Sequence, residues 1–158
     1  MPNASLHQLL DKYGESHQNK TNKLIHWICV PAIFFSVVAL VWSIPVPSLF
    51  AEAGAWLNWA TIALALALFY YVRLSIMMAF GMLLFSGICA WLSFWLQANA
   101  TIPLWQLALS IFVVAWVGQF IGHHIEGKKP SFFDDFLFLL IGPAWLMHFL
   151  YQRLGIRF

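Results

Sequence analysis

Hydrophobic residues form five long runs along the chain, separated by short polar or proline-containing breaks. The runs cover residues 24–44, 54–72, 75–96, 103–122 and 132–151. A helix needs about 20 apolar residues to cross a bilayer, and each run is close to that length. The first four runs therefore predict four transmembrane helices in an all-α, polytopic membrane bundle.

The fifth run differs from the others. It opens with Asp134 and Asp135, and Gly142-Pro143 interrupts it. Because proline removes a backbone donor and breaks or kinks a helix, we expect residues 132–151 to form a broken or re-entrant helix that does not cross the membrane. The two aspartates are expected to cap the helix that follows them or to lie on its wet face.

Residues 1–23 precede the first run and are mostly polar. Leu6, Leu9, Leu10 and Tyr13 recur there at helical spacing, which predicts a short amphipathic helix lying at the membrane interface. A secretory signal would need an early apolar stretch and a small-residue cleavage site, so we expect this segment to be retained. Residues 1–158 are thus interpreted as a single integral-membrane domain.

Composition supports the membrane assignment. The chain is 62% hydrophobic and 9% charged, whereas a soluble domain is about 45–50% apolar and about 25% charged. The net charge of +2 is too small for a nucleic-acid-binding protein, so no nucleic-acid partner is expected. The sequence leaves the oligomeric state open.

Basic residues indicate the orientation of the four crossings. If the N-terminus is cytoplasmic, all basic residues around the four crossings fall on the cytoplasmic side, as the positive-inside rule requires. They are Lys12, Lys20, Lys23, Arg73, Lys128 and Lys129. Arg153 and Arg157 join them if the fifth run does not cross, so both termini are expected to be cytoplasmic. The compact length and the lack of a retention signal favour a bacterial inner membrane over the endoplasmic reticulum.

This topology brings five of the six histidines to one end of the bundle, and His7 alone has no reason to join them. The five are His17, His26, His123, His124 and His148. A single histidine at a membrane interface is often only an amphipathic residue, but neutral imidazole is also the commonest metal ligand. His123 and Glu126 are three residues apart and share a helix face. Nitrogen and carboxylate ligands together suit a non-haem iron site.

Two separated motifs resemble those of the Mpo1-like family. The first is Tyr13-x3-His17-x4-Asn22-x3-His26, followed by a proline in the first span, and the second is Gln119-Phe-Ile-Gly-His123, running on to Glu126 and Pro130. The resemblance covers nearly the whole chain. Lys129 stands where the family has arginine before this proline, and the spacing from His123 to Glu126 is one residue shorter than usual.

The resemblance implies an iron(II)-dependent dioxygenase that shortens 2-hydroxy fatty acids by one carbon, with the acid, O2 and membrane lipid as its partners. It carries over His17, His26 and His123 as catalytic metal ligands, with Asn22 and Glu126 beside them. The topology adds His124 and His148, and one of these two or Glu126 would complete the metal site.

Three further residues have expected roles around that site. Gln119 lies one turn before His123 and could orient it. Lys128 and Lys129 either attract the substrate carboxylate or serve as ordinary membrane anchors. Gly118-x3-Gly122 is a small-residue step that predicts close approach of a second helix beside His123.

Other functions stay open beside the dioxygenase. The chain could be a non-catalytic structural or assembly protein of the membrane, or another metal-dependent lipid oxidoreductase. The histidine clusters of di-iron desaturases are missing from the sequence. The span centres carry almost no charge, which argues against a transporter.

Overall fold

The computed structural model describes residues 2–130 and 137–158, and within them it consists of helices and their connections. The helices are α1 (Pro2–Gly14), α2 (Lys20–Trp42), α3 (Ser48–Ala53), α4 (Trp59–Leu74), α5 (Ile76–Asn99), α6 (Leu104–Glu126) and α7 (Phe138–Leu154). The all-helical prediction is confirmed for these residues.

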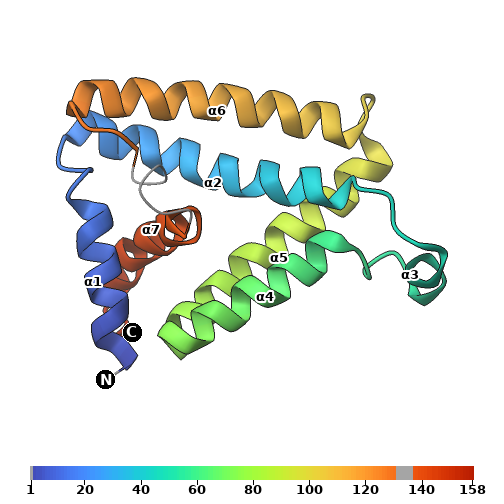
Figure 1. The fold of residues 1–158 in the computed structure, drawn as a ribbon, viewed down its shortest axis with the longest axis horizontal. Coiled ribbons are helices and arrows are strands. Elements are labelled where there is room, and N and C mark those ends of the chain that lie inside the picture. The colour runs from blue at the N-terminus through green and yellow to red at the C-terminus, as the bar shows by residue number, and fades with distance from the viewer. Residues whose placement is uncertain (1, 131–136) are drawn as a thin grey trace.

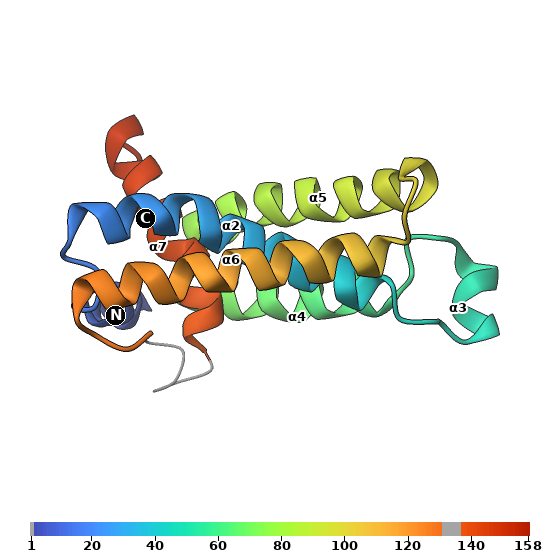
Figure 2. The same ribbon diagram turned by 90° about the horizontal axis from the view of Figure 1, so that it is seen from above.

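The long helices run back and forth between two ends of the molecule. Helices α2 and α6 lie antiparallel along their lengths, and α4 and α5 form a second antiparallel pair below them (Figure 1). Helices α1 and α7 lie together at the end where α2 begins and α6 ends, and both termini are there too (Figures 1 and 2). The N-terminal and C-terminal segments of the chain therefore share one end of the molecule. The short α3 lies at the opposite end (Figure 1).

Two glycines of α6 allow it to approach α2 closely. A Cβ atom at Gly118 would lie 2.6 Å from Cys29 Sγ, and one at Gly122 would lie 2.3 Å from Asn22 Oδ1. Real Cβ atoms do not come so near, so only glycine permits this spacing. The predicted small-residue contact is confirmed, and it sets α6 against the first turns of α2.

Replacing Gly122 by alanine is expected to destabilise the protein by about 1–3 kcal/mol, the usual cost of overpacking. The new methyl group would push the Asn22 amide away from hydrogen bonds that it makes to Ser16 and Glu126. Thermal unfolding in detergent measures the effect. The control is Gly87→Ala, where nothing lies within 4 Å of the new Cβ, and it should unfold no earlier than the wild type. Equal midpoints for the two variants would contradict this account of the α2–α6 contact.

Helices α2, α5 and α6 are long and apolar enough to cross a membrane, whereas α4 has only 16 residues. Much of the outer surface of the long helices is apolar, with Leu24, Ile28 and Val114 each at least 63% exposed. In a membrane such side chains face lipid rather than water. The chain is therefore a helical bundle with three helices that could span a membrane, and the predicted crossing at residues 54–72 is a shorter helix.

The predicted start of the second apolar run, at residue 54, was too early. Asn58 caps α4, with its side-chain oxygen accepting hydrogen bonds from the backbone N–H groups of Ala60 and Thr61. Residues 48–53 form the separate helix α3, and Gly54 has a positive φ of 124° that ends it. Hydropathy alone misplaced this boundary, because the connecting residues are apolar without being helical.

The expected break at Gly142-Pro143 was wrong, because α7 runs through both residues as one helix. Pro143 is the sixth residue of α7, so its missing N–H removes the one intrahelical hydrogen bond that would go to the carbonyl of Leu139. The neighbouring carbonyl of Leu140 accepts a hydrogen bond of 2.6 Å from the hydroxyl of Tyr71 on α4, which anchors this turn from outside. Part of the 132–151 run, including Asp134 and Asp135, lies outside the described residues.

The predicted N-terminal amphipathic helix is shorter than the polar segment of residues 1–23. Helix α1 ends at Gly14, and α2 begins already at Lys20, after an N-cap by the Asn19 side chain. The apolar stripe of α1 is buried, with Leu6, Leu10 and Tyr13 in one cluster with residues of α7. This packing fixes the direction in which the chain leaves α1.

Candidate metal centre

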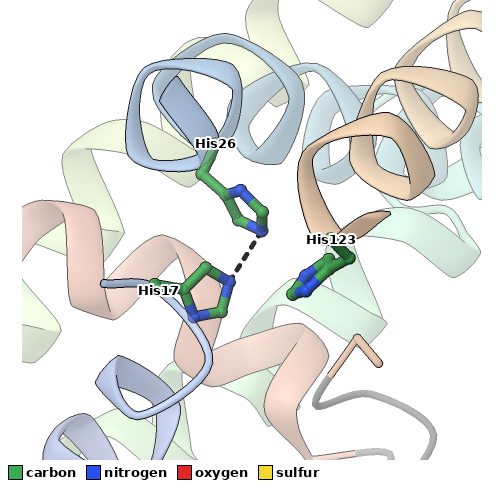
Figure 3. A group of neighbouring side chains, drawn as sticks. All are labelled: His17, His26 and His123. Carbon is green, nitrogen blue, oxygen red and sulfur yellow. Dashed lines mark hydrogen bonds between the residues drawn. The ribbon is translucent and has the colours of Figure 1, made fainter. Parts of the chain in front are cut away.

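Three histidines from separate segments meet at the polar end of the bundle (Figure 3). His17 comes from the connection between α1 and α2, His26 from the second turn of α2, and His123 from the last turn of α6. Each offers a ring nitrogen, and the three nitrogens lie within 4.8 Å of one another. All three side chains are at most 4% exposed. These three histidines could hold a metal ion. Among the described residues, they are the group of metal-ligating side chains whose ligand atoms lie this close together.

The hydrogen bonds of two of these rings determine which nitrogens are free. The Nδ1 atom of His17 bonds to the Tyr13 carbonyl oxygen, and the Nδ1 atom of His26 bonds to the Asn22 carbonyl oxygen. A carbonyl oxygen only accepts, so each Nδ1 carries the hydrogen and each Nε2 carries a lone pair. The two Nε2 atoms face each other at 2.7 Å. Two lone pairs at this separation repel each other, and either a shared proton or a metal ion bound by both nitrogens would relieve the repulsion.

Burial disfavours the proton. Desolvation lowers the pKa of the His17 imidazole to about 4, so this ring is neutral at pH 7. The neutral ring is the form that binds metals. Metal-bound histidines usually donate their other ring N–H to a carbonyl or carboxylate, as His17 and His26 do here. The Nδ1 atom of His123 is also buried and has no hydrogen-bond partner, so this donor set fits a metal ion.

Aromatic side chains hold His17 in place. The ring of Tyr13 stacks on it, with centroids 4.2 Å apart and planes at 13°. Trp145 of α7 lies on another side, at 5.2 Å between ring centroids. The backbone carbonyl of Tyr13 also accepts a hydrogen bond from His17 Nδ1. The last turn of α1 therefore fixes both the orientation and the tautomer of the His17 ring.

Glu126 does not join the three histidines but bridges the segments that carry them. Its Oε1 accepts a hydrogen bond from the backbone N–H of Gln18 at 2.9 Å. Its Oε2 accepts from the backbone N–H of Asn19 at 2.8 Å and from Asn22 Nδ2 at 3.0 Å. The C-terminal end of α6 is thereby fastened to the connection that holds His17 and to the helix that holds His26.

A second contact fastens the same connection. The Lys128 ammonium group donates a hydrogen bond of 2.7 Å to the backbone carbonyl of Glu15. Lys128 thus acts in the structure as a tether of the α1–α2 connection, and Lys129 beside it is exposed. We call Glu126, Lys128 and the backbone of residues 15–19 the clasp.

The remaining sequence candidates lie around the histidine group rather than in it. His124 is exposed on the far side of the α6 turn. His148 packs against Phe149 and Phe158, and His7 stacks on the same Phe158 at 5.5 Å. Gln119 is buried and lines a cavity together with His26 and His123.

This cavity has a volume of about 520 Å³ and is almost wholly apolar. His26, His123 and Gln119 lie at one end of it, and it follows α2 as far as Val41. At 1.5 Å per residue, the path from His26 to Val41 is roughly 22 Å. The acyl chains of one leaflet fill about 15 Å, half of the ~30 Å hydrocarbon core of a bilayer. The cavity is longer than this depth, so it is long enough for a long acyl chain.

Sequence reasoning missed the packing of Tyr13 and Trp145 on His17 and the role of Glu126 in the clasp. A signal for Tyr13 was present, because it precedes His17 by four residues and belongs to the same motif. No pattern in the sequence pointed to Trp145, which comes from a distant helix.

A family model described as 2-hydroxy-palmitic acid dioxygenase Mpo1-like matches residues 3–154, nearly the whole chain. Neither the curated proteins nor the solved structures contain a match.

Proposed function

The chain belongs to the Mpo1-like family, and from this premise we propose that it is a membrane-embedded iron(II) dioxygenase that shortens 2-hydroxy fatty acids by one carbon. The observation that carries the proposal is the pair of facing Nε2 lone pairs of His17 and His26, with His123 beside them. A family name that implies a dioxygenase and a cluster that could hold a metal ion support each other.

The chain's own residues would divide the work as follows. His17, His26 and His123 would hold the metal, with open positions left on it. A bound iron(II) would supply the redox chemistry by which O2 attacks the acid. We propose that these three histidines are the protein's ligands, because three hydrogen bonds already hold the Glu126 carboxylate and because His124 and His148 lie outside the group.

The cavity would hold the acyl chain, and its polar end would receive the head of the acid. Its apolar walls would limit the access of water to the histidine end. Lys128 and Lys129 line a second pocket together with His123, and their positive charge would attract a carboxylate toward the histidines. No protein general acid is needed for the overall change. Loss of C1 as carbon dioxide balances with one O2 per acid, giving the shorter acid and water, so no outside reductant is required.

We further propose four crossings with both termini on the cytoplasmic side, in a bacterial inner membrane. Helix α4 would span about 24 Å, short of the ~30 Å core, and could cross where the bilayer thins. The alternating directions of α2, α4, α5 and α6 (Figure 1) support this arrangement.

The test is to incubate the purified, iron-loaded protein with a 2-hydroxy fatty acid under air and under argon. We expect the acid one carbon shorter to form under air alone, with one O2 consumed per acid. The non-hydroxylated acid of equal length is the control and should remain intact. If no shortened acid forms under air, the enzymatic proposal fails and a structural or assembly role becomes the better explanation.

A further inference from the structure

Three of the α4 residues that line the apolar cavity are alanines at helical spacing, and Leu64, Leu66 and Tyr70 line it beside them. Ala60, Ala63 and Ala67 lie on α4 at intervals of three and four residues, and all three line the cavity. Large side chains at these positions would fill the space between α4 and α2. The three alanines therefore keep part of this space open, and we call them the alanine stripe.

The stripe has a direction relative to the histidines. Helices α2 and α4 are antiparallel (Figure 1). Ala67 packs against the cluster that contains Tyr13 and Val30, near the metal end. Ala60 packs in the other cluster, with Val38 and Trp42, at the far end. Moving from Ala67 to Ala60 therefore means moving away from the histidines by about 10 Å.

The side of the cavity is open. Val37 and Leu66, which line it, are 40% and 67% exposed, and Ala63 is exposed as well. In a bilayer these residues face lipid chains. An apolar chain could therefore enter sideways from the membrane and lie along the stripe, while its polar head meets the end that carries His26, His123 and Gln119.

We infer that the alanine stripe of α4 determines which acyl chain lengths the protein accepts, with Ala60 limiting the longest chain. This inference rests on the proposed function for the identity of the head group. Each methylene that the cavity buries should strengthen binding roughly fourfold. Affinity should therefore rise with chain length until the chain reaches Ala60, and then level off.

The experiment measures displacement of a fluorescent fatty acid from metal-free protein by saturated 2-hydroxy acids, from decanoic to eicosanoic length. It compares the wild type with Ala63→Phe and Ala67→Phe. The phenyl group in Ala67→Phe blocks the cavity about 6 Å nearer the histidines than that in Ala63→Phe. We expect affinity to level off at a shorter chain in Ala63→Phe than in the wild type, and at a still shorter one in Ala67→Phe. Short acids should bind Ala63→Phe as they bind the wild type.

The matched control is Ala65→Phe, which adds the same group to an exposed position of the same helix. Its length profile should equal that of the wild type. Unchanged profiles in both stripe variants, an equal change in Ala65→Phe, or no acid binding by the wild type would each overturn the inference. Graded profiles together with no turnover of any 2-hydroxy acid would instead support the inference and refute the proposed function.

Discussion

Replacing both His26 and His123 by alanine is expected to abolish turnover of 2-hydroxy fatty acids while the helical bundle stays folded. These residues supply two of the three converging nitrogens, one from α2 and one from α6. A catalytic metal contributes several kcal/mol of transition-state stabilisation, so the rate should fall by more than ~100-fold. Helices α2 and α6 remain packed against each other at Gly118 and Cys29. The helix content measured by circular dichroism and the elution volume in gel filtration should therefore be unchanged.

The matched control for this double variant is His124→Ala, which removes an exposed histidine from the same turn of α6. It should keep the activity of the wild type. If His124→Ala were as inactive as the double variant, or if the double variant kept its activity, the three-histidine site would not be the catalytic centre.

Removing the carboxylate of Glu126 should produce the second large effect. Glu126→Ala deletes the acceptor of three hydrogen bonds that hold residues 18, 19 and 22. Residue 18 follows His17 directly, and the Asn22 carbonyl accepts the hydrogen bond of His26. Loss of such supporting contacts commonly costs 10–100-fold in metal affinity. We expect weaker metal binding that saturating metal restores, with Glu126→Gln intermediate because it keeps one oxygen acceptor.

Hydrogen exchange distinguishes a clasp from a metal ligand at this position. In the metal-free protein, residues 15–22 should exchange faster in Glu126→Ala than in the wild type, because the backbone N–H groups of Gln18 and Asn19 lose their acceptor. Glu15→Ala, which changes an exposed carboxylate on the same connection, is the control and should exchange normally. Unchanged exchange together with metal loss that excess metal does not reverse would show that Glu126 ligates the metal directly.

The convergence of His17, His26 and His123 could be predicted from the sequence because it depends mainly on topology. An even number of crossings returns the chain to its starting end, and the two motifs flank the first and fourth apolar runs. His124 and His148 satisfy the same rule, yet they lie outside the group, because topology fixes the end of the bundle but not the direction of a side chain. His124 is one residue beyond His123 and therefore faces another side of α6.

Helix boundaries and the role of Glu126 could not be predicted because they depend on tertiary contacts. Gly142-Pro143 would break an isolated helix, but Tyr71 of α4 supports that turn of α7. The spacing of His123 and Glu126 correctly placed both on one stretch of helix. The spacing could not reveal that the connection after His17 turns its backbone N–H groups toward the carboxylate.

The most direct test of the central claim is the metal content of the purified protein, determined by elemental analysis after anaerobic preparation with iron supplied. The wild type should carry near-stoichiometric iron, and the His26→Ala/His123→Ala variant should carry almost none, since a single remaining imidazole holds iron(II) poorly. Wild-type protein without metal, or equal metal in both proteins, would contradict the assignment of His17, His26 and His123 as a metal centre.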